Sequence, residues 1–419
     1  MLTEPRRGDG SEQKAFDGRS WLLLEKSLGR AEGQVIDHPY PPALLGSMLL
    51  NLHLPSLILT STMQRKAIAR LKTALPWTSA PLIIGAPMRV LSGPSLAVEV
   101  SKAGGLGFIG PGTKPEDLGP ALLQATKLVQ EDSGAALSKC KSDLLPIGIG
   151  VQTWAGDLEQ STRILNGQRR KPAVIWLFAP RHGQKELDEW ALRLRDVSKG
   201  SQIWIQVASV ADAITAAPRS DVLVIQGTDA GGHSLKKGAG IITLLPEVSD
   251  ALNNLGHGDI PLIAAGGIAD SRGVAAALTL GASGVAMGTR LLASNEATIN
   301  PAYQRHVIEA QDGGQNTIRT QFYNHLRGTM DWPEPFDARG IINQSWCDFE
   351  SGMPFEQAKV LHDEAIELGK AWGSNGRTAT YAGTGVGLVN EVKGAGDIIK
   401  QVREGCENIM KSSIEAMRT

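Results

Sequence analysis

From residue 81 onward, short apolar runs rich in Val, Ile and Leu alternate with longer amphipathic stretches. Each run is continuously apolar, a pattern typical of strands that are buried on both faces in a parallel sheet. We expect one strand in each of the eight runs, which are Pro81–Ala86, Leu106–Ile109, Leu145–Val151, Ala173–Phe178, Gln202–Val207, Val222–Gln226, Ile260–Ala265 and Gly284–Met287.

The amphipathic stretches between these runs are predicted to be helices. They are Ser95–Ala103, Pro115–Gln130, Asp157–Asn166, Lys185–Asp196, Val210–Ala217, Ile241–Leu255 and Asp270–Leu280. Pro94 and Pro115 are typical helix starts, because proline is tolerated in the first turn of a helix. Alternating strands and helices predict an α/β fold with parallel strands, and eight such units predict a closed TIM (β/α)₈ barrel over residues 63–296.

The eighth strand is not followed directly by its helix. Residues 297–377 are more polar, hold most of the later aromatic residues, and have a helical pattern broken by prolines. We therefore expect an inserted, mostly helical lid subdomain after strand eight. Residues 378–419 are expected to return to the barrel, with a loop and a last helix within Val386–Ile414.

The first 62 residues carry the least information about the fold. Residues 1–37 are polar and charged, whereas no charged side chain occurs from His38 to Gln64. The apolar part, Leu44–Thr60, falls short of the about 20 residues that a membrane span needs. Three interpretations stay open: an N-terminal extension, a stretch upstream of a true start at Met63, and a weak membrane anchor through residues 39–62.

Composition and charge exclude several classes of function. The chain has 42 basic and 43 acidic residues without long blocks of one sign, which argues against binding nucleic acid or a charged membrane surface. The three cysteines lie far apart and share no metal-ligand spacing, so we expect no metal site and a reducing, cytoplasmic compartment. Motifs for metalloproteases, nucleotide triphosphates and serine hydrolases are missing from the sequence.

Glycines and polar residues gather just after several of the predicted strands, at the barrel end that carries function in this fold. Gly266-Gly267 follows strand seven and Gly288-Thr289 follows strand eight, where barrels commonly bind a phosphate group through bare backbone N–H groups. The alternative interpretation is that these are tight turns without a ligand. The pattern Gly105–Gly110 formally matches a dinucleotide-binding motif, but it follows a helix and precedes a strand, so we reject it.

His233 is the candidate catalytic residue. It follows Gly231-Gly232 shortly after strand six, where the backbone can bring the imidazole over a bound ligand. A neutral imidazole is suited to take up a proton near neutral pH. His182, after strand four, is the competing histidine, and its neighbours suggest an ordinary solvated loop.

Together these motifs resemble the nitronate monooxygenase family, also called 2-nitropropane dioxygenase-like flavoproteins. The resemblance is close over about residues 80–300 and looser around Tyr381–Leu388; it is carried by Gly85–Met88, Ala103–Ile109, Gly227–His233 and Pro261–Ser294. It implies a barrel that binds FMN and oxidises alkyl nitronates or nitroalkanes with O₂, with His233 acting at the substrate. The residues that it implies for the cofactor are Ala86, Pro87, Met88, Gln206, Gln226, Gly231, Gly232, Gly266, Gly267, Gly288 and Thr289.

Within that resemblance, Arg89 stands after Met88 where a small residue is common, and Gln152 ends strand three in place of an asparagine-rich segment. Two other functions are kept as alternatives. One is an FMN-dependent reductase of the enoyl reductase kind that uses NAD(P)H, and the other is a non-redox barrel that binds a phosphorylated ligand. The expected partners are a small nitronate-like substrate and O₂, and a homodimer is compatible with the sequence.

Overall fold

The computed structural model describes residues 57–111, 115–131, 136–140 and 143–418. The predicted extension and candidate anchor therefore lie outside the described residues, except for residues 57–62. These begin helix α2 (Leu57–Ala74), which runs across the boundary predicted at residue 62. None of the helices in the described ranges is long and apolar enough to cross a membrane.

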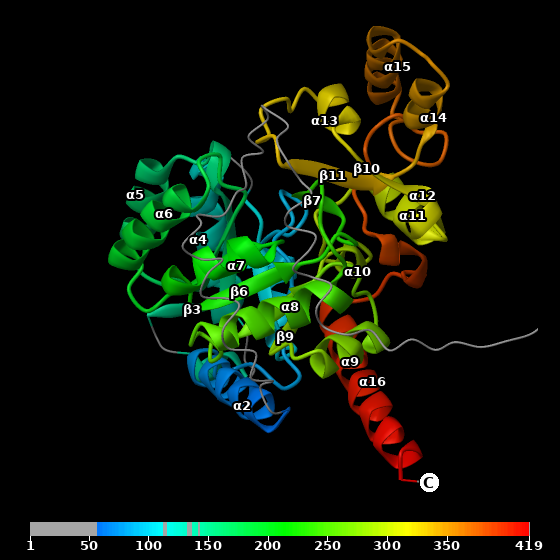
Figure 1. The fold of residues 1–419 in the computed structure, drawn as a ribbon. Helices are drawn as coiled ribbons and strands as arrows, with labels where there is room; N and C mark the ends of the chain where they lie inside the picture. Colours follow the sequence, from blue (N-terminus) through cyan, green and yellow to red (C-terminus); the bar gives the residue numbers. More distant parts are fainter. Residues whose placement is uncertain (1–56, 112–114, 132–135, 141–142, 419) are drawn as a thin grey trace, which may run out of the picture. The chain divides into compact units, whose positions relative to one another are not determined.

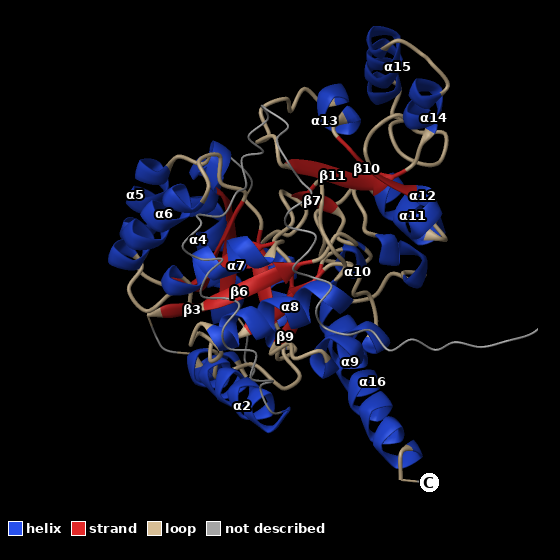
Figure 2. Cartoon of the chain, viewed as in Figure 1, coloured by secondary structure: helices blue, strands red, loops and turns tan. Residues whose placement is uncertain are grey.

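Eight parallel strands form a closed barrel in the order β1-β2-β3-β4-β5-β6-β8-β9 (Figure 2). Their bounds are β1 Ile83–Gly85, β2 Leu106–Ile109, β3 Leu144–Gln152, β4 Lys171–Phe178, β5 Gln202–Val207, β6 Val222–Gln226, β8 Leu262–Ala265 and β9 Gly284–Met287. The barrel closes where Ile83 of β1 pairs with Val285 of β9. All eight predicted strands are confirmed, and the continuous burial of β8, for example, explains its uniformly apolar sequence.

An outer layer of helices covers the barrel, as predicted. It consists of α3 Pro94–Lys102, α4 Leu118–Gln130, α5 Leu158–Gly167, α6 Gln184–Val197, α7 Val210–Ala216, α8 Ile241–Asn254, α9 Ser271–Thr279 and the last helix, α16 Ala395–Ala416. The chain marks several helix starts with a side chain that accepts a backbone N–H bond, namely Asp157, Ser209 and Asp270. Helix α16 packs against α9 and α3 and thereby completes the ring (Figure 1).

The segment between β9 and α16 is the inserted lid. Its elements are α10 Thr289–Leu292, α11 Pro301–Glu309, α12 Gly313–Asn316, β10 Thr317–Thr320, α13 Phe322–Leu326, β11 Phe336–Ile341, α14 Gln344–Glu350 and α15 Phe355–Glu367. The insertion is mostly helical, as expected, but it also contributes two strands. They form an antiparallel sheet in the order β10-β11-β7, in which β7 (Gly232–Leu235) comes from the segment after β6.

This small sheet contains His233. The sequence predicted no strand shortly after strand six, whereas the structure places the histidine on β7, opposite Ala338 of β11. The strand is only four residues long and begins with glycine, so it carries no strand pattern of its own. It forms because β11, about 100 residues further along the chain, supplies its hydrogen-bonding partner.

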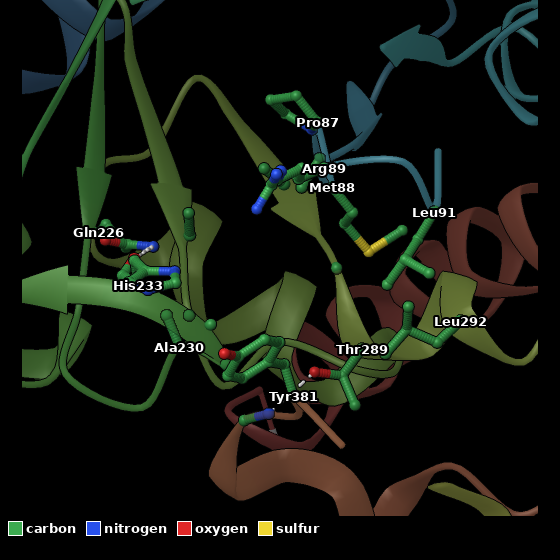
Figure 3. Close-up of a pocket in the computed structure, with 18 of the residues that line it drawn as sticks. Pro87, Met88, Arg89, Leu91, Gln226, Ala230, His233, Thr289, Leu292 and Tyr381 are labelled. Atoms are coloured by element: carbon green, nitrogen blue, oxygen red, sulfur yellow. Dashed lines mark hydrogen bonds between the residues drawn. The ribbon is translucent and has the colours of Figure 1, made fainter. Parts of the chain in front are cut away.

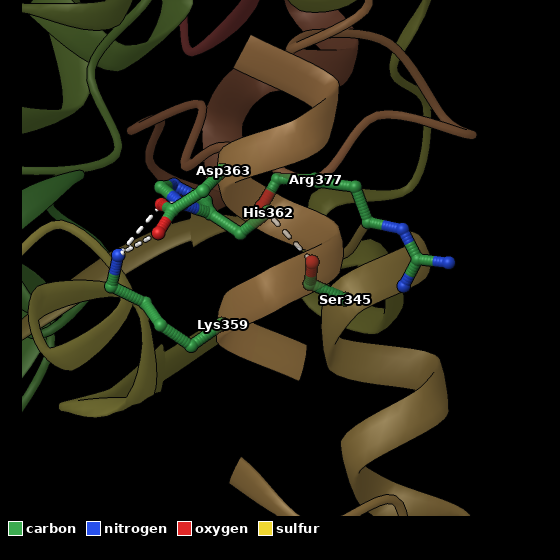
Figure 4. Close-up of polar contacts among 5 residues, drawn as sticks. All are labelled: Ser345, Lys359, His362, Asp363 and Arg377. Atoms are coloured by element: carbon green, nitrogen blue, oxygen red, sulfur yellow. Dashed lines mark hydrogen bonds and ion pairs between the residues drawn. The ribbon is translucent and has the colours of Figure 1, made fainter. Parts of the chain in front are cut away.

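Two sets of polar contacts lie in the part of the lid that holds α14 and α15 (Figure 4). Within α15, His362 donates to Asp363 through Nδ1 at 2.9 Å, and Lys359 donates to the same carboxylate. Ser345 on α14 donates to the carbonyl of Arg377, in the segment after α15, at 3.0 Å. None of these five residues lines the large cavity described below, so these contacts belong to the lid and not to the site.

Candidate active site

A cavity of about 470 Å³ lies at the carboxyl ends of the barrel strands, between the barrel loops and the inserted lid. Its size falls in the range of about 300–1,000 Å³ that is usual for small-molecule and cofactor sites. All twelve predicted site residues line it, namely Ala86, Pro87, Met88, Gln206, Gln226, Gly231, Gly232, His233, Gly266, Gly267, Gly288 and Thr289. In Figure 3, His233 and Gln226 lie on one side of this space and Met88, Thr289 and Leu292 on others.

His233 is held on several sides. Its ring stacks on Trp332 of the lid, with ring centroids 3.5 Å apart and planes 7° from parallel. Its Nε2 lies 3.1 Å from Oδ1 of Asn324, and its backbone carbonyl accepts a bond from Gln226 at 3.3 Å. Burial lowers the pKa of His233 to about 3, and the nearby Arg319 and Arg327 charges act in the same direction. The imidazole is therefore neutral at neutral pH.

The competing histidine does not belong to the site. His182 is exposed, does not line the cavity, and its backbone N–H donates to Glu186 at the start of α6. Several aromatic residues of the lid reach the cavity, among them Trp332, Tyr303 and Trp372. Others pack on one another inside the lid instead, as Phe322 and Phe349 do with centroids 4.4 Å apart.

The glycine loops are shaped to bring bare backbone to the cavity. Gly266 and Gly267 have φ angles of +101° and +75°, which residues with a side chain rarely adopt. A Cβ on Gly267 would lie 2.9 Å from Cβ of Asp229, so the loop also packs too closely for any other residue. Asp270 already accepts the first amides of α9. An anionic group would therefore meet the Gly266-Gly267 and Gly288-Thr289 backbone rather than the start of that helix.

These residues fit a flavin with a phosphate group. The side-chain oxygens Oε1 of Gln152 and Gln226 are buried in the cavity wall without a hydrogen-bond partner among the described residues. A planar ring with N–H donors would satisfy such acceptors, because buried polar atoms in native proteins are nearly always paired. The space beside Gly288 is open, because a Cβ added there would have Met88 as its nearest neighbour, at 3.8 Å. This space leaves room for the chain that joins the flavin ring to its phosphate group.

Arginines surround the loop that leads to His233. Arg319 on β10 donates to the carbonyls of Thr228, Ala230 and Gly232 and to that of Asp337 at distances between 2.7 and 3.2 Å. A second guanidinium, that of Arg339, also reaches Thr228. Because one side chain of the lid bonds three carbonyl groups between Thr228 and Gly232, the segment that connects β6 to β7 is held in place by the lid.

Two further arginines, Arg89 and Arg327, line the cavity itself. Neither forms an ion pair with a carboxylate among the described residues. Partial burial and the neighbouring Arg327 charge lower the pKa of Arg89, so the two guanidiniums lie close enough to repel one another. Unpaired cations at a cavity make it attractive to an anion.

Sequence reasoning did not find Asn324, Trp332, Tyr381 or Arg327. All four come from the inserted segment or the return to the barrel. The nearest of them in sequence, Asn324, lies 91 residues after His233. Arg89 carried a signal, since it departs from the small residue common in the resembling family. Tyr381 begins the looser part of the family resemblance, Trp332 is one of the aromatic residues of the predicted lid, and Asn324 and Arg327 carried no signal.

The fold and the cavity together define a class of protein, a (β/α)₈-barrel enzyme whose reacting groups lie at the carboxyl ends of its strands beneath an inserted lid. Comparison with known proteins then gives the family. The chain belongs to the nitronate monooxygenase family, whose model matches residues 72–405. Members are flavin-dependent monooxygenases, so the resemblance, the enzyme class and the flavin cofactor expected from the sequence are confirmed.

Individual relatives agree with this assignment. A nitronate monooxygenase of Metarhizium robertsii is 51% identical over 361 residues, covering 85% of this chain and 99% of the relative. A nitronate monooxygenase of Neurospora crassa is 36% identical and covers 82% of this chain and 94% of its own. Among solved structures, FabK of Thermotoga maritima has a TM-score of 0.61 at 27% identity, covering 83% of this chain and 98% of that one.

Proposed function

We propose that this enzyme oxidises small alkyl nitronates with O₂, that its flavin is FMN, and that His233 acts at the substrate and takes up the α-proton when the parent nitroalkane is bound instead. The observation that carries the proposal is the single cavity in which His233, the two glycine loops and the unpaired arginines meet. When bound, the flavin takes electrons from the substrate and passes them to O₂. The protein supplies binding, orientation and electrostatics.

The position of the two glycine loops favours FMN over a larger flavin cofactor. The Gly266-Gly267 and Gly288-Thr289 loops follow neighbouring strands, β8 and β9, and both line the cavity. One phosphate group at this pair of loops matches the usual phosphate site of such barrels. Ala86, Pro87 and Met88 would then lie beside the ring, and Gln152 and Gln226 would accept hydrogen bonds from it.

The charges favour a substrate that is already an anion. Arg89 and Arg327 attract the nitronate. His233 is neutral and therefore adds no charge of its own to the cavity. A neutral nitroalkane would have to give its α-proton to an imidazole whose pKa is lowered to about 3. We therefore expect turnover of the nitronate to exceed turnover of the parent nitroalkane at neutral pH.

Two measurements test the proposal. Cofactor released from the purified protein is expected to have the mass of FMN, and a different flavin would refute that part. Anaerobic addition of propane-2-nitronate is expected to bleach the flavin absorbance, and O₂ to restore it. If NADH or NADPH bleached the flavin rapidly while the nitronate left it unchanged, the reductase alternative would replace the monooxygenase.

A further inference from the structure

Two polar side chains from the lid and the return segment, Tyr381 and Asn324, form a chain that ends on His233. The Arg327 guanidinium lies 5.5 Å from the centroid of the Tyr381 ring. Tyr381 donates to Oδ1 of Asn324 at 3.1 Å, and the same oxygen lies 3.1 Å from Nε2 of His233. Asn324 is fully buried, at 0% exposure.

The direction of this chain follows from the Tyr381 hydroxyl, which donates to Oδ1 of Asn324. An amide oxygen can only accept, so Nε2 of His233 must be the donor in the remaining bond. The opposite amide orientation would turn Nδ2 of Asn324, which has no partner among the described residues, toward Tyr381 and Nε2, and the imidazole proton would then lie on Nδ1. The ¹⁵N measurement below distinguishes the two orientations.

We propose that Asn324 is a positioning residue which, together with Tyr381, holds His233 in the neutral tautomer protonated on Nε2, so that Nδ1 is the atom that exchanges a proton with the substrate. The role of Nδ1 at the substrate rests on the proposed function. The tautomer itself does not, because it is a property of the resting protein.

The surroundings of the ring leave Nδ1 as the open position. Trp332 covers one face of the imidazole in parallel stacking, and Asn324 occupies Nε2. Nδ1 has no hydrogen-bond partner among the described residues, and it is not one of the buried polar atoms sealed from the cavity. Its lone pair is thus free toward the cavity that His233 lines.

The chemistry of this arrangement balances simply. When the bound molecule is the parent nitroalkane, its α-proton moves from carbon to Nδ1, and the bonding electron pair stays on the substrate as the nitronate. The imidazolium that results keeps its Nε2–H bond to Asn324. Because asparagine is uncharged, it fixes the tautomer without the strong stabilisation of the imidazolium that a carboxylate at the same place would give.

The direct test is ¹⁵N NMR of the holoenzyme labelled on its histidine imidazoles, with the His233 signals assigned by their loss in His233→Gln. At neutral pH we expect a protonated Nε2 and an unprotonated Nδ1, each recognised by its characteristic shift. A protonated Nδ1 with an unprotonated Nε2 would overturn the proposal. This measurement needs no substrate, so it distinguishes failure of the tautomer from failure of the proposed function.

Two substitutions then test the role of Asn324. Asn324→Leu removes the acceptor, and the Nδ1-protonated form should become populated; an unchanged tautomer would show that Asn324 does not determine it. Asn324→Asp keeps the acceptor but adds a charge. We expect the pKa of His233 to rise by at least about one pH unit, and the acid limb of the kcat/KM profile to move with it.

Asn343 provides a matched control. It is also a buried asparagine of the lid, at 1% exposure, but it bonds Tyr323 and the carbonyl of Thr378 instead of His233. Asn343→Asp should leave the tautomer and the pKa of His233 unchanged. If Asn343→Asp moved that pKa as far as Asn324→Asp does, the effect would be general electrostatics of the lid and the assigned role of Asn324 would be wrong.

Discussion

The burial of His233 has a consequence for stability that can be measured without any assay of catalysis. Its pKa lies at about 3 in the folded protein and at 6.5 when exposed, as in the unfolded chain. Between these values the unfolded state binds a proton that the folded state does not. Stability therefore increases with pH through this window and is lost as the pH falls below 6.5, at about 1.4 kcal/mol per pH unit.

The expected size of the effect follows from the same two values. Lowering the pH from about 7.5 to about 4.5 should cost the folded state about 2.6 kcal/mol through His233 alone. The measurement is the free energy of unfolding in urea at several pH values, for the native sequence and for His233→Gln at equal FMN concentration. Other titrating groups are common to both proteins and cancel in the difference between them.

Glutamine is the suitable replacement because its side-chain amide can still donate to Asn324 but does not titrate. We expect the difference in free energy between the two proteins to change by about 2.6 kcal/mol over this range, with the native protein losing more. A difference that stays constant from about pH 7.5 to about pH 4.5 would show that His233 is protonated as readily in the folded protein as in the unfolded chain, and would refute the desolvation argument.

Three further predictions concern the cavity wall and the loop beneath it. Gly267→Ala should cost about 1–3 kcal/mol of stability and weaken FMN binding, measured by flavin fluorescence, because its Cβ would meet Asp229 at 2.9 Å; Gly256→Ala, which has the same positive φ but open space, should retain full FMN affinity. Arg327→Met and Arg89→Met should each raise KM for the nitronate about tenfold and reduce its dependence on salt, and an unchanged KM in both would remove the anion argument. Arg319→Met should lower the free energy of unfolding by at least about 3 kcal/mol, because four carbonyl groups lose a charged donor; a loss below about 1 kcal/mol would contradict this.

The barrel could be predicted because its information is local. Each parallel strand is buried on both faces, so its sequence is a continuous apolar run. Strands β8 and β9 show this pattern along their whole length. The helices between them carry amphipathic patterns and capping residues such as Asp270. The glycine loops were predictable for a related reason, since their residues follow the strand ends directly.

The small sheet and the hydrogen-bonding partners of His233 could not be predicted in this way. Strands β10 and β11 contain Arg319 and Arg339, whose polar side chains interrupt any strand pattern. Both are held inward by carbonyl groups of a loop about 90–110 residues earlier in the chain. A short stretch of sequence contains no pattern that predicts such a contact. For the same reason Asn324 and Tyr381 look like ordinary polar residues until the fold brings them to His233.

The return segment links the lid to the segment that carries His233. Gly383 packs so closely on the loop before β7 that an added Cβ would lie 2.5 Å from the carbonyl oxygen of Asp229. Its N–H donates to Thr289, and Thr384 donates to Asp229, so this segment joins the loop after β6 to the one after β9.

Tyr381 lies two residues before Gly383, and Asn324 lies on α13, earlier in the same insertion. Both segments therefore have to be in place before Nε2 of His233 has its partner. Under the proposed role of His233, a lid substitution that changes which substrates fit would also change the tautomer of the histidine, because the same segments form the cavity wall and hold Nε2. Substrate choice and proton transfer would then be coupled through the insertion after the eighth strand.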